Sequence, residues 1–273
     1  MRIGVACLYN EVEKTLDLIE KNKDFINHLE IGIDKVAQID EIAPFISKIE
    51  ELGLSIGLHL AMEINTSEDI EYIRNSWAKF CAEIYTGVEI LNPVYLNLHL
   101  GYAIRSRFLN NKKRYTDNTV DFFFELSKIF KKLSRIPVIT VENSYSFGCG
   151  ELTNTGISTG EFEYIFEKTK DIREKYNMPY FCFDTGHCIL SRDDYSKLKK
   201  FTKVIHISDC DGKEDNHLEI FGGKLSFDDL NLALDMQPEY AVIEVKSDNI
   251  EKSIFKVKNF LSCGRESYGN FGN

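Results

Sequence analysis

The sequence predicts a single (β/α)8 barrel, on the strength of two observations. Eight short runs rich in apolar and β-branched residues recur along its 273 residues, and segments of helical periodicity lie between them. Strands that alternate with helices form βα units and a parallel sheet. Eight such units in about 260 residues fit a closed barrel better than an open sheet.

The eight predicted strands are short apolar runs bounded by polar or turn-forming residues. In chain order they are RIGVACL (2–8), HLEIGI (28–33), LSIGLHL (54–60), VYLNLHL (94–100), PVITVEN (137–143), YFCFDTG (180–186), KVIHISD (203–209) and YAVIEVK (240–246). No linker or low-complexity segment divides them. We therefore expect one catalytic barrel domain over residues 1–262.

The predicted helices are amphipathic segments that end near a Gly, Asn or Pro signal. They cover residues 11–22, 40–53, 67–85, 120–134, 159–177 and 249–261. The last ten residues, GRESYGNFGN, are rich in Gly and Asn. We expect residues 263–273 to form a flexible C-terminal tail.

The composition excludes several classes of protein. A formal net charge of -10 and a pI near 5.2 argue against a protein that coats nucleic acid through bulk positive charge, so any phosphate site must be local. Seven cysteines without a CxxC pair indicate a reduced, cytoplasmic protein. The N-terminus lacks signal-peptide features, and no run of about 18 apolar residues occurs, so we expect no membrane segment. Nothing in the sequence indicates an obligate protein partner.

Polar residues fall at the strand ends where a barrel places its chemistry. Five of the six histidines and four carboxylates follow this pattern: His59, His99, Glu142, Asp184, His187, His206, Asp215, His217 and Glu244. The remaining histidine, His28, begins the second strand, at the opposite rim. A lone histidine in a strand is more often a hydrogen-bonded core residue than a ligand. Nine polar side chains at one mouth favour a ligand site.

A metal centre explains this gathering of side chains. Carboxylates that converge without a counter-ion repel one another, whereas divalent cations neutralise them and bind neutral imidazoles. Histidine with Asp or Glu and no Cys suits zinc, manganese or iron, and nine ligands exceed the need of one tetrahedral zinc. We therefore predict two or three ions.

The spacing of the ligands fits this interpretation. Asp184 ends a strand and His187 lies in the turn after it, so the two can reach separate ions. Asp215 and His217 are two apart in a loop expected to be extended, which points both side chains to one side and toward one ion. The cysteines near the DTGH and HISD motifs are expected to be small buried hydrophobes.

The motifs HLAMEIN, NLHLG, ENS, DTGH, HISD, DNH followed by GGK, and IEV resemble those of the xylose isomerase-like barrels, and among them endonuclease IV, over nearly the whole chain. The resemblance implies three zinc ions and no organic cofactor. His59, His99 and Glu142 would hold the first ion. Glu142 as a bridge, with Asp184, His206 and Glu244, would hold the second, and His187, Asp215 and His217 the third. It also implies phosphoester hydrolysis, of abasic DNA or a smaller phosphate ester, with Glu142, Glu244 and Asp184 as the catalytic residues.

The chain departs from the endonuclease IV pattern at three places. Met62 stands where relatives carry an aromatic residue, and Gly222-Gly223-Lys224 replaces the usual Gly-Glu-Gly. The second strand continues as EIGIDKVAQID, without the arginine and aromatic loop that open a duplex. A nucleotide-flipping enzyme needs such wedges.

A local basic stretch follows the fourth strand. The segment GYAIRSRFLNNKKRY, predicted to be a loop at the catalytic mouth, carries Arg105, Arg107, Lys112, Lys113 and Arg114. We expect these cations to bind a substrate phosphate, the alternative being a solvated surface loop. The predicted partner is a phosphorylated small molecule or damaged DNA.

The same family contains sugar and sugar-phosphate isomerases and epimerases. Their site resembles Glu142, Asp184, His206 and Glu244 around a single manganese, magnesium or cobalt ion, with Glu142 and Glu244 moving a proton on either face of the substrate carbon. His187 would bind a substrate oxygen. The larger number of ligands favours hydrolysis. A binding barrel with vestigial metal sites is a third interpretation, which the nine intact ligand types argue against.

Overall fold

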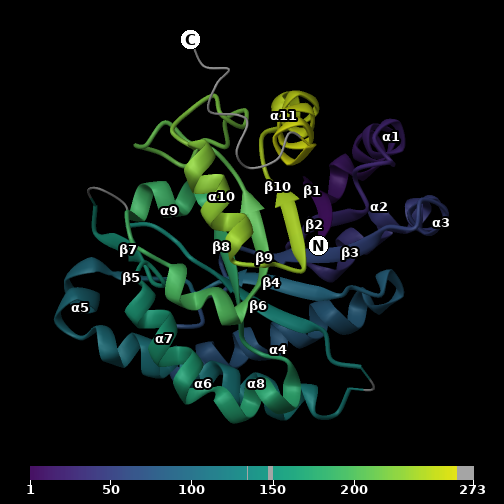
Figure 1. The fold of residues 1–273 in the computed structure, drawn as a ribbon. Helices are drawn as coiled ribbons and strands as arrows, with labels where there is room; N and C mark the ends of the chain where they lie inside the picture. Colours follow the sequence, from purple (N-terminus) through teal and green to yellow (C-terminus); the bar gives the residue numbers. More distant parts are fainter. Residues whose placement is uncertain (134, 147–149, 263–273) are drawn as a thin grey trace.

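The computed structural model describes residues 1–133, 135–146 and 150–262 and shows a closed barrel of eight parallel strands (Figure 1). The barrel strands are β1 (Arg2–Leu8), β2 (His28–Ile33), β3 (Ser55–Leu60), β4 (Tyr95–His99), β6 (Val138–Glu142), β8 (Tyr180–Asp184), β9 (Thr202–Ile207) and β10 (Tyr240–Ile243). They pair in chain order, and β10 closes the ring on β1. The predicted (β/α)8 barrel is confirmed, and each predicted run supplies one strand.

Helices surround the barrel (Figure 1). They are α1 (Val12–Lys21), α2 (Ile39–Ile42), α3 (Ile46–Glu51), α4 (Glu71–Gly87), α5 (Arg105–Asn110), α6 (Lys112–Phe130), α7 (Thr159–Lys168), α8 (Lys170–Tyr176), α9 (Thr185–Ser191), α10 (Phe227–Asp235) and α11 (Ile250–Ser262). Each longer helix turns an apolar stripe toward the strands. In α1, for example, Val12, Leu16 and Ile19 are buried against the barrel.

Two predicted helices are broken. The segment 40–53 divides into α2, a 3₁₀ turn and α3, because Pro44 has no N–H to donate and its ring crowds the preceding turn. The segment 159–177 divides into α7 and α8. Arg173 Nη1 donates to the carbonyl oxygen of Phe166 at 2.9 Å, which satisfies an acceptor near the break.

The basic stretch predicted as a loop after the fourth strand is largely helical, so that prediction was wrong. The chain passes through a small antiparallel sheet, β5 (Tyr102–Ile104) with β7 (Leu152–Asn154), and then forms α5 and the start of α6. Phe108 and Tyr115 are buried together with Ala103, and this cluster anchors both helices. Two buried aromatic residues in a polar stretch are too sparse a pattern to reveal helical periodicity.

Alternation along the strands decides which side chains point into the barrel. An apolar layer lies inside it, formed by Tyr95, Cys182, Val204 and Val242. Two residues further along β8 and β9, the interior becomes polar, with Asp184 after Cys182 and His206 after Val204. The candidate site is therefore the uppermost layer of the barrel interior, at the C-terminal ends of the strands.

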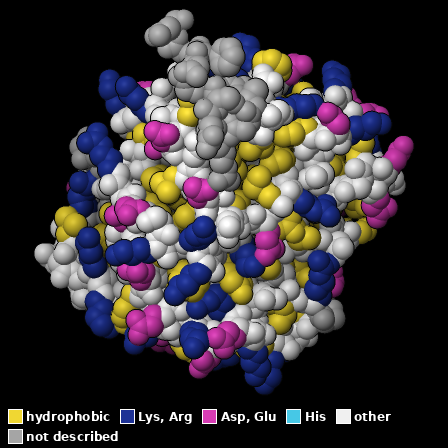
Figure 2. Space-filling model, viewed as in Figure 1, with side chains coloured by type: hydrophobic (Ala, Val, Ile, Leu, Met, Phe, Trp, Pro, Cys, Tyr) yellow, Lys and Arg dark blue, Asp and Glu magenta, His cyan; other side chains and the backbone are white. Residues whose placement is uncertain are grey.

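The surface of the described part of the chain is mixed in charge. Lys and Arg side chains are interspersed with Asp and Glu over the face seen in Figure 2. Among the described residues, no helix is both long and apolar enough to span a bilayer. Helix α11 ends at Ser262, and the predicted tail, 263–273, lies outside the described residues.

Candidate metal centre

The nine side chains predicted as metal ligands meet at the C-terminal end of the barrel. His59, His99, Glu142, Asp184 and His206 lie on β3, β4, β6, β8 and β9; His187 lies in α9; Asp215 and His217 follow β9, and Glu244 follows β10. The strand register sets neighbouring ligands at one height, since His99 aligns with Glu142 and Asp184 with His206. Glu244 was predicted to lie on the last strand and comes one residue after it.

The first predicted group, His59, His99 and Glu142, is compact. One ligand atom from each lies within 4.8 Å of the others. His59 Nε2 is 3.3 Å from Glu142 Oε2, and the rings of His59 and His99 have centroids 5.1 Å apart. Two imidazoles and a carboxylate at this spacing can hold one divalent ion.

The second predicted group, Glu142, Asp184, His206 and Glu244, is equally compact, with ligand atoms within 4.8 Å of one another. His206 Nδ1 lies 3.1 Å from Glu142 Oε2 and 2.8 Å from Glu244 Oε2. Asp184, Glu142 and His206 are almost completely buried. Three carboxylates this close would repel one another strongly without a cation between them.

The third predicted group is joined through Asp215. Asp215 Oδ2 lies 3.0 Å from His187 Nε2 and 3.3 Å from His217 Nε2. The prediction of an extended loop is wrong at His217, because this residue has a φ of 44°. Backbone in this region is strained for a non-glycine residue and concentrates at functional sites.

Glu142 connects the three groups. Its Oε2 contacts His59 and His206, and its Oε1 lies 3.1 Å from His187 Nδ1. Asn97 Nδ2 also donates to Oε2, at 2.6 Å. The Glu142 carboxylate is thus fixed in position between imidazoles of different groups, and His187 Nδ1 also lies 2.8 Å from the carbonyl oxygen of Asn143.

The DTGH motif forms the start of a helix rather than a turn. The Asp184 carboxylate caps α9 by accepting the backbone N–H of His187 at 2.6 Å, as acidic residues commonly do at helix N-termini. Ser208 Oγ donates to both oxygens of the same carboxylate, at 3.0 and 2.8 Å. The motif therefore fixes the Asp184 carboxylate and places the His187 side chain beside Asp215.

Without a metal ion, protons on some of the imidazoles balance the negative charge of the carboxylates at the site. Burial opposes the charged form of His59, but the hydrogen bond to Glu142 and the negative charges of Glu142, Glu30 and Glu244 together outweigh it and raise the pKa of His59 to about 9. Burial likewise opposes the charged form of His217, but the hydrogen bond to Asp215 and the charges of Glu244, Asp215 and Asp184 raise its pKa to about 9. Burial lowers the pKa of His99 to about 4 and raises that of Asp184 to about 6.

Several buried polar atoms of the site lack a hydrogen-bond partner among the described residues. They include His206 Nδ1, Glu244 Oε2, Asp215 Oδ1 and Glu30 Oε1. His206 Nδ1 and Glu244 Oε2 lie 2.8 Å apart but are not in hydrogen-bond geometry. Buried polar atoms are nearly always hydrogen-bonded, so unsatisfied atoms at one place call for an explanation. The first three belong to predicted ligands, and ligation of a divalent ion satisfies them. The residues present therefore fit a metal centre.

A cavity of about 600 Å³ opens above the centre. Seven of the nine predicted ligands line it: His59, His99, Glu142, His187, Asp215, His217 and Glu244. Its rim is mixed, with Leu8 57% and Met62 70% exposed and with Lys246 beside Asp248. A cavity of this size accepts a small molecule.

The five predicted phosphate-binding cations lie outside this cavity, since none is among the described residues that line it. Lys113 pairs with Asp117 at 2.7 Å and Arg114 with Asp69 at 2.7 Å. Arg107 lines a smaller, separate cavity of about 180 Å³. Arg105 Nη2 donates to Ser146 at 3.3 Å, and Lys112 lies over the ring of Phe108. Their binding of phosphate stays a prediction.

Sequence reasoning missed two buried carboxylates near the site. Glu30 on β2 is 1% exposed and contacts His206. Asp209, in the HISD motif, is fully buried and accepts four backbone N–H groups, from Cys210, Gly223, Lys224 and Leu225, at 2.7–2.8 Å. The available signal was an acidic residue inside a run otherwise typical of a buried strand, because such a residue requires partners.

Cys182 lies inside the barrel beside the centre, with ligand atoms of Glu142 and His206 within reach of the same position. Burial raises the pKa of its thiol well above the ordinary value. The prediction of a small buried hydrophobe fits its place in the apolar layer.

Comparison with other sequences identifies a distant relative. The uncharacterised protein MJ1614 of Methanocaldococcus jannaschii is 23% identical over 256 residues, which span 92% of this chain and 94% of the relative. None of the protein-family models searched matches this chain.

Solved structures share the fold at low sequence identity. A D-tagatose 3-epimerase-like protein matches with a TM-score of 0.77 at 20% identity, over 96% of this chain and 98% of its own. Endonuclease IV from Thermus thermophilus matches with a TM-score of 0.69 at 15% identity, over 97% and 100%. D-psicose 3-epimerase from Clostridium cellulolyticum gives 0.70 at 15%, over 97% and 98%. The fold is the xylose isomerase-like barrel, as the motifs implied, and its neighbours are enzymes of both predicted chemistries.

Proposed function

We propose that this protein is a metal-dependent enzyme that hydrolyses phosphoesters at a centre of two or three divalent ions, zinc being the ion that best suits the ligands. One observation carries the proposal. The two oxygens of the Glu142 carboxylate face His59 and His206 on one side and His187 on the other, at 3.1–3.3 Å. A carboxylate that contacts imidazoles of three groups suits a centre of several ions. A single ion needs fewer ligands than these groups provide.

Bound ions would supply the Lewis acid that polarises the phosphoester and lowers the pKa of water. The chain's own contribution is to hold the ligands rigidly. Asn97 fixes Glu142, and Ser208 together with the backbone N–H of His187 fixes Asp184. Ligands that are already oriented lose little conformational freedom when an ion binds.

The negative charge of the residues that line the cavity favours the binding of cations. The cavity is lined by the carboxylates of Glu11, Glu30, Asp34, Glu142, Asp215, Glu244 and Asp248, and Lys246 is the one Lys or Arg among the described residues that line it. An anionic phosphate would be repelled by such a surface until divalent ions neutralise its charge. We propose a phosphorylated small molecule as the substrate, since its size suits the cavity. A damaged nucleotide of DNA is the alternative and would have to be flipped into the cavity.

A second candidate function is a one-metal sugar or sugar-phosphate isomerase or epimerase. The observation in its favour is that Glu142 and Glu244 both lie within 3.1 Å of His206 Nδ1. Two carboxylates beside one imidazole ligand can serve as the acid and the base around a single ion. The fold likeness to epimerases is compatible with this chemistry and does not by itself select it.

Metal content per chain, measured by plasma mass spectrometry on protein purified without added metal, tests the proposal. We expect two to three zinc ions, together with zinc-dependent hydrolysis of p-nitrophenyl phosphate, bis-p-nitrophenyl phosphate or an abasic oligonucleotide. One manganese, magnesium or cobalt ion, with exchange of solvent deuterium into a ketose or its phosphate, would establish the second candidate. A chain that binds no divalent ion would overturn both.

A further inference from the structure

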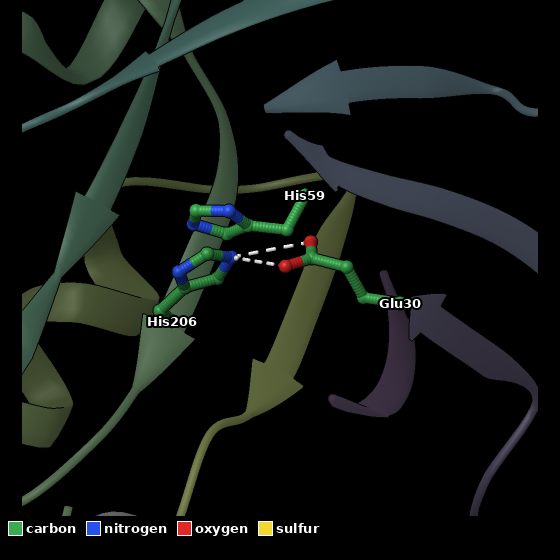
Figure 3. Close-up of side chains that lie close together, drawn as sticks. All are labelled: Glu30, His59 and His206. Carbon is green, nitrogen blue, oxygen red and sulfur yellow. Dashed lines mark hydrogen bonds and ion pairs between the residues drawn. The ribbon is translucent and has the colours of Figure 1, made fainter. Parts of the chain in front are cut away.

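Glu30 is the buried acidic residue beside the centre that neither candidate chemistry uses. It lies on β2 and is 1% exposed. Figure 3 shows its side chain pointing across the barrel toward His206 on β9, with His59 of β3 beside them. Removing a carboxylate from water costs several kcal/mol, so its partners must stabilise it.

Glu30 contacts the ring nitrogen of His206 that faces away from the other carboxylates. His206 Nε2 lies 3.2 Å from Glu30 Oε2, in hydrogen-bond geometry, and 3.1 Å from Oε1. The opposite nitrogen, Nδ1, faces Glu142 and Glu244 at 3.1 and 2.8 Å. The imidazole is therefore held between Glu30 on one side and the predicted ligands Glu142 and Glu244 on the other.

The orientation of Glu30 is itself fixed. The hydroxyl of Tyr95 donates a hydrogen bond to Glu30 Oε2. His28 Nε2 lies 2.9 Å from the same hydroxyl, and His28 Nδ1 lies 2.8 Å from Ser55 Oγ. A continuous set of polar contacts thus runs up the barrel from the N-terminal ends of the strands to His206. Every group in it is buried except Ser55, which is partly exposed.

We propose that Glu30 is a positioning residue for the metal centre, acting through His206; the inference rests on the proposed metal-dependent function. An imidazole that binds an ion through one nitrogen carries its proton on the other, and a carboxylate at that second nitrogen fixes the tautomer and the ring orientation. Glu30 holds the proton on Nε2 and leaves the Nδ1 lone pair directed at the second group of ligands. Tyr95 keeps the Glu30 carboxylate in place for this task.

A competing role must be separated from this one. Glu30, His59 and His206 have ligand atoms within 4.8 Å of one another, so Glu30 could itself be a ligand in an additional site. That arrangement would use His206 Nε2 as the donor atom and break its hydrogen bond to Glu30. The two roles differ in the number of ions bound, because a positioning residue changes affinity and a ligand changes stoichiometry.

The variants Glu30→Gln and Glu30→Ala test the proposal in the full chain, with Glu161→Gln as the matched control. Glu161 is another buried glutamate, which does not line the cavity and accepts N–H groups from Gly156 and Ile157 just before α7. Zinc stoichiometry and affinity are measured by titration against a chromophoric chelator. The histidine N–H region of the proton NMR spectrum of the zinc-loaded proteins is recorded alongside, with His206 assigned by its loss in His206→Gln.

We expect both Glu30 variants to bind the wild-type number of zinc ions with about 10–100-fold lower affinity at the weakened site. The low-field His206 N–H signal should shift or vanish, and Glu161→Gln should change neither result. If Glu30→Ala does not fold, Glu30→Gln, which keeps the size of the side chain, gives the answer. Wild-type affinity with an unchanged His206 signal overturns the inference, as does the loss of one bound ion per chain. A wild-type protein that binds no zinc overturns the proposed function as well, whereas zinc-bound wild type with unaffected Glu30 variants overturns the inference alone.

Discussion

Asn97 Nδ2 donates a hydrogen bond of 2.6 Å to Glu142 Oε2 inside the barrel. Asn97 also accepts, through its Oδ1, the hydroxyl of Thr140 at 2.8 Å, so its amide orientation is set from both ends. The neutral amide stabilises the ionised Glu142 without adding charge. Despite burial, the neighbouring His206 and His99 hold the pKa of Glu142 well below its usual range. Glu142 is therefore ionised and oriented to bind a cation.

Glu142→Gln is expected to abolish activity under either candidate chemistry. The bridging ligand of the hydrolase is the acid or base of the isomerase, and an amide can serve in neither role. The loss should reach at least about 100-fold in kcat/KM, since even the indirect supports of metal ligands are worth about 10–100-fold. Both the hydrolysis and the deuterium-exchange assays should be run on this variant. Full activity in either would show that the site lies elsewhere.

His217→Ala separates the two chemistries. It removes a ligand of the third group, whose members are joined through Asp215, and leaves Glu142, Asp184, His206 and Glu244 in place. A multinuclear hydrolase should lose about one ion per chain and about 100-fold or more in kcat, whereas a one-metal isomerase should keep most of its activity. Lys213→Ala, an exposed change in the same loop, is the control. Unchanged zinc content in His217→Ala would rule out the third group as a metal site.

The basic stretch offers a test of phosphate binding outside the cavity. We predict that neutralising Arg105, Arg107, Lys112, Lys113 and Arg114 together raises KM about tenfold for a phosphorylated substrate and leaves kcat unchanged, because exposed charge contacts are worth only about 0.2–1 kcal/mol each. Neutralising Lys131 and Lys132, exposed cations at the end of α6, should have no effect. An unchanged KM in the fivefold variant would assign these cations to the solvated surface.

Asp209 supports the loop that carries Asp215 and His217. Besides its four accepted N–H groups, its own carbonyl oxygen accepts the N–H of Leu218 at 2.8 Å. The Gly223 backbone comes so close to Cys210 that a Cβ at position 223 would collide with the Cys210 carbonyl oxygen.

Asp209→Ala would leave several buried backbone N–H groups without an acceptor. It should therefore lower the free energy of unfolding by about 3–5 kcal/mol. Urea denaturation of the metal-free protein measures this value. Asp211→Ala is the control, because Asp211 bonds exposed N–H groups at 2.8 and 3.0 Å and should cost about 1 kcal/mol or less. Equal losses in the two variants would show that Asp209 has no special structural role.

The ligands on strands were predictable because strand alternation and barrel geometry together dictate where they point. His99, Asp184 and His206 each end or nearly end an apolar run, and in a parallel barrel such positions converge. The loop after β9 was less predictable, since the positive φ of His217 comes from packing that no local pattern encodes.

Glu30 was missed for a different reason. In HLEIGI, a single acidic residue inside an apolar run signals a buried carboxylate that needs partners, but which residues are the partners becomes evident only once β2 is placed opposite β9. Its partners Tyr95 and His206 come from strands far away in sequence. The helical nature of the basic stretch was hidden because only Phe108 and Tyr115 mark its buried face.

Metal binding should strengthen as pH rises toward about 9. In the metal-free protein the carboxylate partners raise the pKa of His59 and of His217 to about 9, so below that pH each ring holds a proton that an ion must displace. Only the neutral imidazole is a ligand. Each such proton should lower the apparent affinity about tenfold per pH unit on going down from pH 9. His99 is neutral already, because burial lowers its pKa to about 4, and it should not contribute to the slope.

Zinc affinity measured by chelator competition at about pH 6.5, 7.5 and 8.5 gives this slope directly. Calorimetry in buffers of different ionisation enthalpy counts the released protons independently. In His59→Ala and in His217→Ala the slope should fall by one proton, whereas His99→Ala should weaken binding and keep the slope. These three variants remove the same kind of ligand, so a difference in slope reports the protonation of each ring and not the loss of a ligand as such. An affinity that does not change with pH would show that the imidazoles are neutral before the ion arrives, and the ion pairs of His59 with Glu142 and of His217 with Asp215 would then be hydrogen bonds between a carboxylate and an uncharged ring.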